Sequence, residues 1–458
     1  MTKRIIFSLS VIALTQVVVV RTTTMGQGAL VPSGPPGPIM KTLDQIEPRQ
    51  PIGTLPFTIT NSGVYYLTGP LNGTANQNGI TVSAENVTID LNGFTLTSGN
   101  NSLAAITVNG TRHGLKVQNG AIFGWLSGIA ASTSSDGVFQ NLTFSNLDGR
   151  ALEAGGHSTV WQCRASGGGS DAIKVGANSN VTDCSAVQNS GNGISVGLSS
   201  FVSRCNVASN SGNGIVTDHF GIVENCQSFS NGSAGMGALN GCRFTGCTFG
   251  GNQAGGLAAG DNTQVENCAA VNNIGVGILI GNVSQIENTK SSGSSTSGFW
   301  LGADCYLRNS TAANNGDNGV ATTDDAHISD CKSSGNGSSG FRVNNGSTIQ
   351  NCSAQHNATD GILVTSECTV TGSTANANFN ARDAAGIHAT GTGNCVKDNN
   401  VVSNDRGLSA ENPGNAFLRN TVSNNSLNYS LSDEQVMAPT LTKESIKAAA
   451  NPWSNLTY

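Results

Sequence analysis

Charged side chains are scarce in this sequence, and proline is missing from most of it. Charged residues make up 11% of the chain and form no cluster of Lys and Arg, so no surface for nucleic acid is expected. The 11 prolines all lie outside residues 71–412. Because proline cannot donate to a β-ladder, this gap indicates a long region of paired strands.

The N-terminus has the pattern of an export signal. Lys3 and Arg4 precede an apolar run over residues 5–20, which Arg21 ends. We expect a cleaved bacterial signal peptide over residues 1–28, and hence a secreted, cell-surface or periplasmic protein. No later segment is apolar enough to cross a bilayer, so no membrane span is expected in the mature chain. Residues 29–56 are rich in Pro and Gly and predict a linker, with a short amphipathic piece at 40–47.

A pattern of 21 residues recurs from Cys163 to Asn378. Three of its columns are Cys163, Cys184, Cys205, Cys226, Cys247, Cys268, Cys331 and Cys352; Gly193, Gly214, Gly235, Gly256, Gly277, Gly298, Gly319, Gly340 and Gly361; and Asn189, Asn210, Asn231, Asn252, Asn273, Asn315, Asn336, Asn357 and Asn378, with Ser294 as the break. A fixed period of this length is typical of a solenoid.

Apolar residues alternate with polar ones inside each repeat, as in half-buried strands. This predicts an all-β fold: a single-stranded, right-handed parallel β-helix with three short strands per 21-residue coil. Residues 57–430 have room for roughly 17 coils at the strand spacing of a sheet. The tail at 431–458 is expected to cap the exposed end, with a short helix as one form of the cap.

Each column has an expected role in the stack. The glycines are expected to turn the chain with φ above zero, and the asparagines to hydrogen-bond one another from coil to coil. The cysteines are expected to form a buried, reduced column, because stacked side chains pointing the same way have poor geometry for a disulfide. A bridge between Cys242 and Cys247, within one coil, remains an alternative.

The repeats, together with the opening segment 34–40 and the ending Asn451-Pro452-Trp453, resemble the pectate-lyase-like right-handed β-helix superfamily, and secreted bacterial β-helix repeat proteins in particular. The resemblance implies the fold and a range of activities: polysaccharide lyases, hydrolases, epimerases and phage spikes. Polygalacturonases in this superfamily carry N-T-D, D-D, G-H-G and R-I-K motifs, and only Asp324-Asp325 matches one of them. Arg308 is loosely similar to the arginine base of pectate lyases, but no motif around it matches.

Acidic side chains gather in the turn after the first strand of each coil. Asp304 and Asp325 fall in the same column one coil apart, so their Cα atoms are expected roughly 5 Å apart. Paired carboxylates at such separations hydrolyse glycosidic bonds. The candidate catalytic residues are therefore Asp304, Asp324, Asp325 and His327. The candidate substrate-binding residues are Trp300, Tyr306 and Arg308.

A purely structural interpretation competes with this one, because Asp is a common turn residue that bonds nearby backbone. The same holds for a four-residue insertion near 380–384, which carries Arg382 and Asp383 with His388 shortly after. Insertions on solenoids often mark the binding face, but a solvated loop explains the residues too.

Function therefore stays open. We expect a secreted β-helix repeat protein that interacts with polysaccharide through an outward face of the solenoid. The alternatives are a polysaccharide lyase or glycoside hydrolase that uses the carboxylates, and a non-catalytic surface or adhesin rod. The regular 21-residue coils leave low walls for a catalytic groove and favour the rod, whereas the superfamily favours carbohydrate. We expect a monomer, with no metal site and no cofactor.

Overall fold

The computed structural model describes residues 48–98, 102–379, 383–445 and 451–458. The chain divides into two units, residues 1–48 and residues 49–458, and the second contains every described strand. The expected signal peptide and the amphipathic piece at 40–47 lie outside the described residues. Strand β1 (Gln50–Ile52) pairs with β3 (Gly63–Leu67), so paired structure begins within the residues expected to form a linker.

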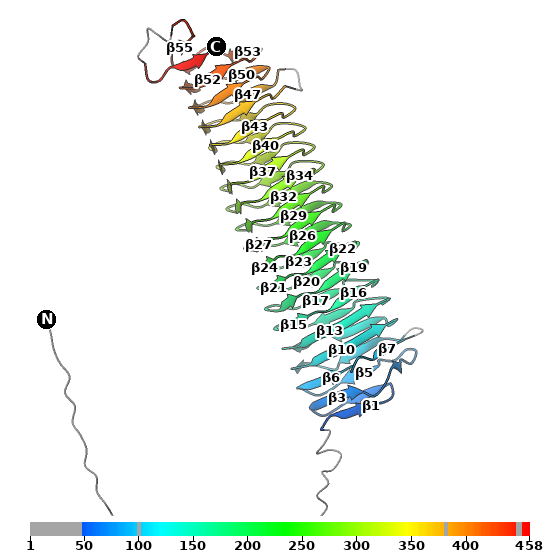
Figure 1. Cartoon of the computed structure of the whole chain (residues 1–458). Coiled ribbons are helices and arrows are strands. Elements are labelled where there is room, and N and C mark those ends of the chain that lie inside the picture. Colours follow the sequence, from blue (N-terminus) through cyan, green and yellow to red (C-terminus); the bar gives the residue numbers. More distant parts are fainter. Residues whose placement is uncertain (1–47, 99–101, 380–382, 446–450) are drawn as a thin grey trace, which may run out of the picture. The chain divides into compact units, whose positions relative to one another are not determined.

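Residues 49–458 wind into coils that stack on one another through three ladders of parallel strands (Figure 1). The first ladder contributes one strand to each of 18 coils, close to the number expected. Its strands are β2 (Phe57–Ile59), β5 (Ile80–Val82), β8 (Ala104–Val108), β11 (Ser127–Ala131), β14 (Leu152–Ala154), β17 (Ile173–Val175), β20 (Ile194–Val196), β23 (Ile215–Thr217), β26 (Ala234–Ala238), β29 (Gly255–Ala259), β32 (Val276–Ile280), β35 (Phe299–Leu301), β38 (Val320–Thr322), β41 (Phe341–Val343), β44 (Ile362–Val364), β47 (Ala385–Ala389), β50 (Arg406–Ala410) and β53 (Leu427–Leu431).

The second and third ladders merge where β10 and β13 run through both without a break. The second consists of β1, β3, β6 (Val87–Asp90), β10 (Lys116–Phe123), β13 (Val138–Ser145), β15 (Thr159–Trp161), β18 (Asn180–Thr182), β21 (Phe201–Ser203), β24 (Ile222–Glu224), β27 (Arg243–Thr245), β30 (Gln264–Glu266), β33 (Gln285–Glu287), β36 (Tyr306–Arg308), β39 (His327–Ser329), β42 (Thr348–Gln350), β45 (Thr369–Thr371), β48 (Cys395–Lys397), β51 (Ala416–Leu418) and β54 (Val436–Met437).

The third ladder continues from these shared strands on either side. It consists of β4 (Leu71–Asn72), β7 (Thr95–Thr97), β16 (Arg164–Ser166), β19 (Ser185–Val187), β22 (Asn206–Ala208), β25 (Gln227–Phe229), β28 (Thr248–Gly250), β31 (Ala269–Val271), β34 (Lys290–Ser292), β37 (Thr311–Ala313), β40 (Lys332–Ser334), β43 (Ser353–Gln355), β46 (Thr374–Asn376), β49 (Asn400–Val402), β52 (Thr421–Ser423), β56 (Asn455–Thr457) and β55 (Thr440–Leu441). Separately, β9 (Arg112–His113) pairs with β12 (Ser134–Ser135).

The register places like residues over like, because equivalent residues in the regular coils are 21 apart. In the first ladder Ile194 pairs with Ile215, and Val196 pairs with Thr217. Both ends of these strands are buried and the middle residue faces outward. The inward side chains of all three ladders form one apolar core along the stack, which removes them from water and drives folding.

The asparagine column forms the expected ladder of amides. Asn210 Nδ2 donates to Asn231 Oδ1 at 3.1 Å, and Asn231 Nδ2 donates to Asn252 Oδ1 at 3.0 Å. Each Oδ1 also accepts from the backbone N–H of the preceding asparagine, as Asn231 Oδ1 does from Asn210 N at 3.1 Å. These side chains are buried, so the ladder satisfies backbone and amide groups that water cannot reach.

The cysteine column lies in the core. The twelve cysteines are free thiols, and all but Cys395 are buried. Cys205 Sγ lies 3.3 Å from the carbonyl oxygen of Ser203, and Cys226 Sγ accepts from Cys205 N–H at 3.4 Å. Cys242 and Cys247 remain separate thiols. The thiols therefore act as small buried side chains with weak hydrogen bonds to backbone.

The expected role of the glycine column is wrong in one respect. None of these nine glycines has a φ in the positive range. They are required by contact instead: a Cβ at Gly319 would lie 1.9 Å from Ser333 Oγ and 2.7 Å from Asn336 Nδ2. The positive φ values occur in the tight turns between ladders, for example at Asp183 and Asn225, because Asn and Asp tolerate this conformation.

The insertion and the tail interrupt the period near the C-terminal end. Ile362 pairs with Ile387, 25 residues later, so four extra residues enter before β47, as expected. In the tail, β56 pairs with both β52 and β55, so strands extend the stack beyond residue 430. The described residues of the tail contain no helix; residues 446–450 lie outside them.

Candidate functional site

The seven candidate residues lie on two faces and on the turn between them. Trp300 is the outward residue of β35 in the first ladder and is 43% exposed. Tyr306 and Arg308 are the outward residues of β36 in the second ladder. The chain turns between these strands at residues 302–305. Trp300 and Tyr306 therefore lie on different ladders, with a turn of the chain between them.

The carboxylates lie in this turn. Asp304 and Asp325 occupy equivalent positions one coil apart, with φ of 55° and 58°, and both are exposed. Among the described residues, neither carboxylate has an ion-pair or side-chain hydrogen-bond partner. Asp324 differs, because its Oδ1 accepts from Asn345 N–H of the next coil at 3.2 Å. Asp324 thus has the structural role of a turn residue, and Asp304 and Asp325 stay available to a ligand.

His327 stacks directly on Tyr306. The two are register partners on β39 and β36, and their ring centroids lie 5.0 Å apart with an interplanar angle of 13°. The guanidinium carbon of Arg308 lies 5.3 Å from the Tyr306 ring centroid. A shallow hollow of about 120 Å³ adjoins them, lined also by Gln285 and Glu287. The His327 ring and the Arg308 guanidinium thus pack against Tyr306 on the second ladder, where Tyr306 stays 37% exposed.

The first ladder carries an outward row that sequence analysis did not single out. This central row consists of the middle residues of successive strands: Lys174, Ser195, Val216, Gly237, Ala258, Leu279, Trp300, Ala321, Arg342, Leu363, His388 and Ser409. In the sequence these residues stand at the variable position between two apolar columns, so their outward direction could have been predicted. The 21-residue period does not show that this outward row, and not another, lies beside a groove.

Part of the central row, from Lys174 to Val216, lines a groove. Its volume is about 500 Å³, and its lining includes Ser195, Val216 and the backbone of Gly197. Lys174 and Leu239 stand at its margins, with Leu239 50% exposed. Farther along the row come Leu279 (38% exposed) and Trp300 (43% exposed). From Lys174 to Trp300 the row crosses six coil intervals, roughly 30 Å at sheet spacing.

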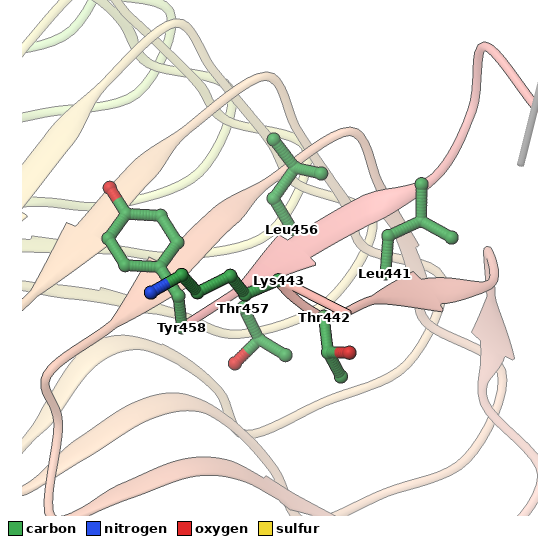
Figure 2. Close-up of a pocket in the computed structure, with 6 residues that line it drawn as sticks. All are labelled: Leu441, Thr442, Lys443, Leu456, Thr457 and Tyr458. Carbon is green, nitrogen blue, oxygen red and sulfur yellow. The ribbon is translucent and has the colours of Figure 1, made fainter. Parts of the chain in front are cut away.

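A second apolar pocket lies at the C-terminal end of the stack. Its volume is about 320 Å³, and β55, β56 and the residues that follow them line it (Figure 2). Figure 2 shows Leu441 and Leu456 on one side of these strands, with Thr442 and Thr457 on the other. Tyr458, which also lines the pocket, is 69% exposed. No charged group of the candidate site lines this pocket, so it forms a separate surface.

His388 on the central row lies between two carboxylates. Its Nδ1 lies 3.2 Å from Asp360 Oδ2, and its Nε2 lies 3.2 Å from Glu411 Oε1. Burial alone would lower the pKa of His388, but the hydrogen bond to Asp360 and the charges of Asp360 and Glu411 outweigh it and raise the pKa. In the insertion, Asp383 pairs with Arg406 at 2.8 Å; Arg382 lies outside the described residues.

Among the described residues, no group of three or more His, Cys, Asp or Glu side chains is arranged to hold a metal ion. The same residues include no helix that could span a membrane.

The solved structures that are similar to this chain share little sequence identity with it. No curated protein matches it. Among solved structures, the A-module of the Azotobacter vinelandii mannuronan C-5 epimerase AlgE4 is similar over 78% of this chain and 91% of that chain, at 14% identity and a TM-score of 0.33. A GH87 alpha-1,3-glucanase catalytic domain is similar over 59% of this chain and 61% of that chain, at 14% identity and a TM-score of 0.40. The periplasmic alginate epimerase AlgG is similar over 82% of this chain and 79% of that chain, at 12% identity and a TM-score of 0.33.

The family model described as a right-handed beta helix region matches residues 104–269 and 257–404. Together these matches span residues 104–404, or 301 of the 458 residues. This agrees with the parallel ladders and confirms the expected hand of the coil. The chain belongs to the right-handed β-helix family.

Proposed function

We propose that this protein binds a polysaccharide lengthwise along the central row, with Trp300 at one end of the binding surface. The observation that supports this most is the groove of about 500 Å³ lined in part by small side chains. Ligand sites are typically concave, mostly apolar and equipped with a few polar groups. Here Lys174, Ser195 and Asp218 supply the polar groups.

The shape of the surface favours a linear polymer over a small molecule. The residues that line the groove come from four successive coils, from Lys174 to Leu239, and the row continues past Ala258 to two exposed apolar side chains, Leu279 and Trp300. An indole presents a large apolar face together with one N–H donor, which suits a sugar ring with an apolar face and hydroxyl edges. We further propose that the protein is exported and acts as a monomer; residues 1–28 support the export.

Binding is tested by affinity electrophoresis and calorimetry against a panel of neutral and anionic polysaccharides. Trp300→Ala should raise the dissociation constant about tenfold, the loss of a modest hot spot. Trp161→Ala is the matched control, because Trp161 is 39% exposed but lies on β15 of the second ladder. Equal effects of the two substitutions, or no binding in the panel, would favour the non-catalytic rod.

Turnover is a second candidate function, supported by the two unpartnered carboxylates Asp304 and Asp325. A pair of carboxyl groups can serve as general acid and base, or as acid and nucleophile, on a glycosidic bond. The reaction would be followed by reducing ends and by unsaturated-uronate absorbance. Asp325→Asn keeps a residue that tolerates positive φ and should abolish turnover while binding persists. Turnover that survives in this variant would remove the pair from the mechanism.

A further inference from the structure

One charged side chain is buried in the described part of the stack, and it lies beside the insertion. Asp360 is 7% exposed, and the other buried polar residues there are Ser, Thr and Asn. It occupies the position before a column glycine, where the preceding coils have Asn318 and Ser339. Burying an unpaired carboxylate is costly, so such a group requires close partners.

Two partners hold Asp360 in place. Its Oδ1 accepts from Ala385 N–H at 2.8 Å, at the first residue of β47. Its Oδ2 lies 3.2 Å from His388 Nδ1 on the same strand. Asp360, in the preceding coil, therefore fixes the orientation of the His388 ring. The His388 side chain is 15% exposed, whereas that of Glu411, which faces Nε2 from the coil above, is 62% exposed.

The three side chains come from three consecutive coils. Asp360 precedes β44, His388 lies on β47, and Glu411 follows β50. Both ring nitrogens face carboxylate oxygens, and an imidazole can donate at both nitrogens only when it is protonated. The arrangement therefore matches an imidazolium between two carboxylates, and it spans the coils where the insertion breaks the 21-residue period.

We propose that Asp360, His388 and Glu411 form a proton-dependent clamp that holds β47 and the coils after it against the rest of the stack. The clamp is closed when His388 is charged. It loosens as the solution becomes alkaline, because a neutral imidazole donates from one ring nitrogen only. The other ring nitrogen is then an acceptor that faces a carboxylate oxygen, and this contact is repulsive.

Other charged groups near His388 do not replace its partners. Arg406 on β50 is paired with Asp383. Arg342, on β41, lies two coils before His388 in the central row. The residues directly below and above His388 in the row are the uncharged Leu363 and Ser409. Asp360 and Glu411 are thus the groups that decide its charge.

The direction of the pH dependence follows from the raised pKa of His388. Its contribution is fully present below the unfolded-state value of about 6.5 and is lost as the pH rises through the higher folded value. The clamp therefore acts from mildly acidic to near-neutral pH.

Hydrogen exchange of the full chain, corrected for the intrinsic pH dependence of exchange, tests the clamp. Between pH 6 and pH 9, protection of β47, β50 and β53 should fall roughly tenfold for each unit by which the pKa of His388 is raised. Protection of β20, β23 and β26 should stay constant as the internal reference. His388→Gln should remove this pH dependence, and Glu411→Gln should reduce it.

His327→Gln is the matched control, because His327 is exposed on the second ladder and should leave the profile unchanged. A pH-dependent loss that persists in His388→Gln, or one spread evenly over the stack, would overturn the proposal. If His388→Gln fails to fold, Glu411→Gln decides alone: an unaltered profile in that variant contradicts the clamp.

Discussion

Asn336 Nδ2 donates to Asn357 Oδ1 at 2.9 Å, and Asn336 Oδ1 accepts from both the side chain and the backbone N–H of Asn315. One side chain therefore joins three consecutive coils inside the core. Asn336→Ala removes these bonds and leaves buried donors without acceptors. We expect the free energy of unfolding to fall by about 3 kcal/mol, measured by denaturant titration. An unchanged midpoint would show that the amide ladder does not stabilise the stack.

The ladder has one gap, and filling it should stabilise the protein. Ser294 stands in the asparagine column, and its hydroxyl is buried without a hydrogen-bond partner among the described residues. In Ser294→Asn the new side-chain oxygen would accept from the Asn273 amide, and the new side-chain N–H would donate to Asn315, so the amide ladder would continue through this coil. The expected gain is about 1 kcal/mol. Thr296→Asn, on the exposed part of the same turn, should leave the unfolding midpoint unchanged.

Substitution by alanine should cost far more stability at Gly319, in the glycine column, than at Gly237, on the central row. A Cβ at Gly319 would meet Ser333, Asn336 and the carbonyl oxygen of Gly340, so Gly319→Ala should cost about 3 kcal/mol through overpacking. A Cβ at Gly237 has open space around it, and Gly237→Ala should be neutral or slightly stabilising. The same denaturant titration compares the two, and equal costs would contradict the contact explanation.

The buried thiols should be inert until the coils open. Burial raises the pKa of Cys242, Cys305 and Cys368, which lowers the thiolate fraction that reacts. Alkylation of the native protein near pH 7, read by intact mass, should label at most Cys395, the one half-buried thiol. All twelve should react in denaturant without a reductant. Thiols that react only after reduction would show disulfides in place of the reduced column.

The stacking of the coils is readable from the sequence because it depends on a local period. Each coil repeats the same short-range pattern, so the partner of Asn210 is found by counting 21 residues to Asn231. The role of the column glycines was misjudged for a related reason. Their requirement comes from side chains of the next coil, such as Asn336 beside Gly319, and not from their own φ.

The candidate site was less readable because it depends on which face each residue joins. Trp300 and Tyr306 are six residues apart in the sequence, yet a turn separates their ladders. His388 has partners 28 and 23 residues away. The insertion lengthens the first of these separations, and neither equals the 21-residue period. The groove itself is lined by small residues such as Ser195 and Gly197, and small residues carry no chemical signature in a sequence rich in Gly, Ser and Ala.

The most direct test of polysaccharide binding along the central row is to obstruct the row without changing the fold. Gly237→Leu places a side chain into open space on the central row, next to the groove-lining Val216, and Gly69→Leu places one into open space on an early turn of the stack. Calorimetric titration with the polysaccharide that binds best should show at least a tenfold weaker affinity for Gly237→Leu and an unchanged affinity for Gly69→Leu. Equal affinities for the two variants and the unaltered protein would contradict the account.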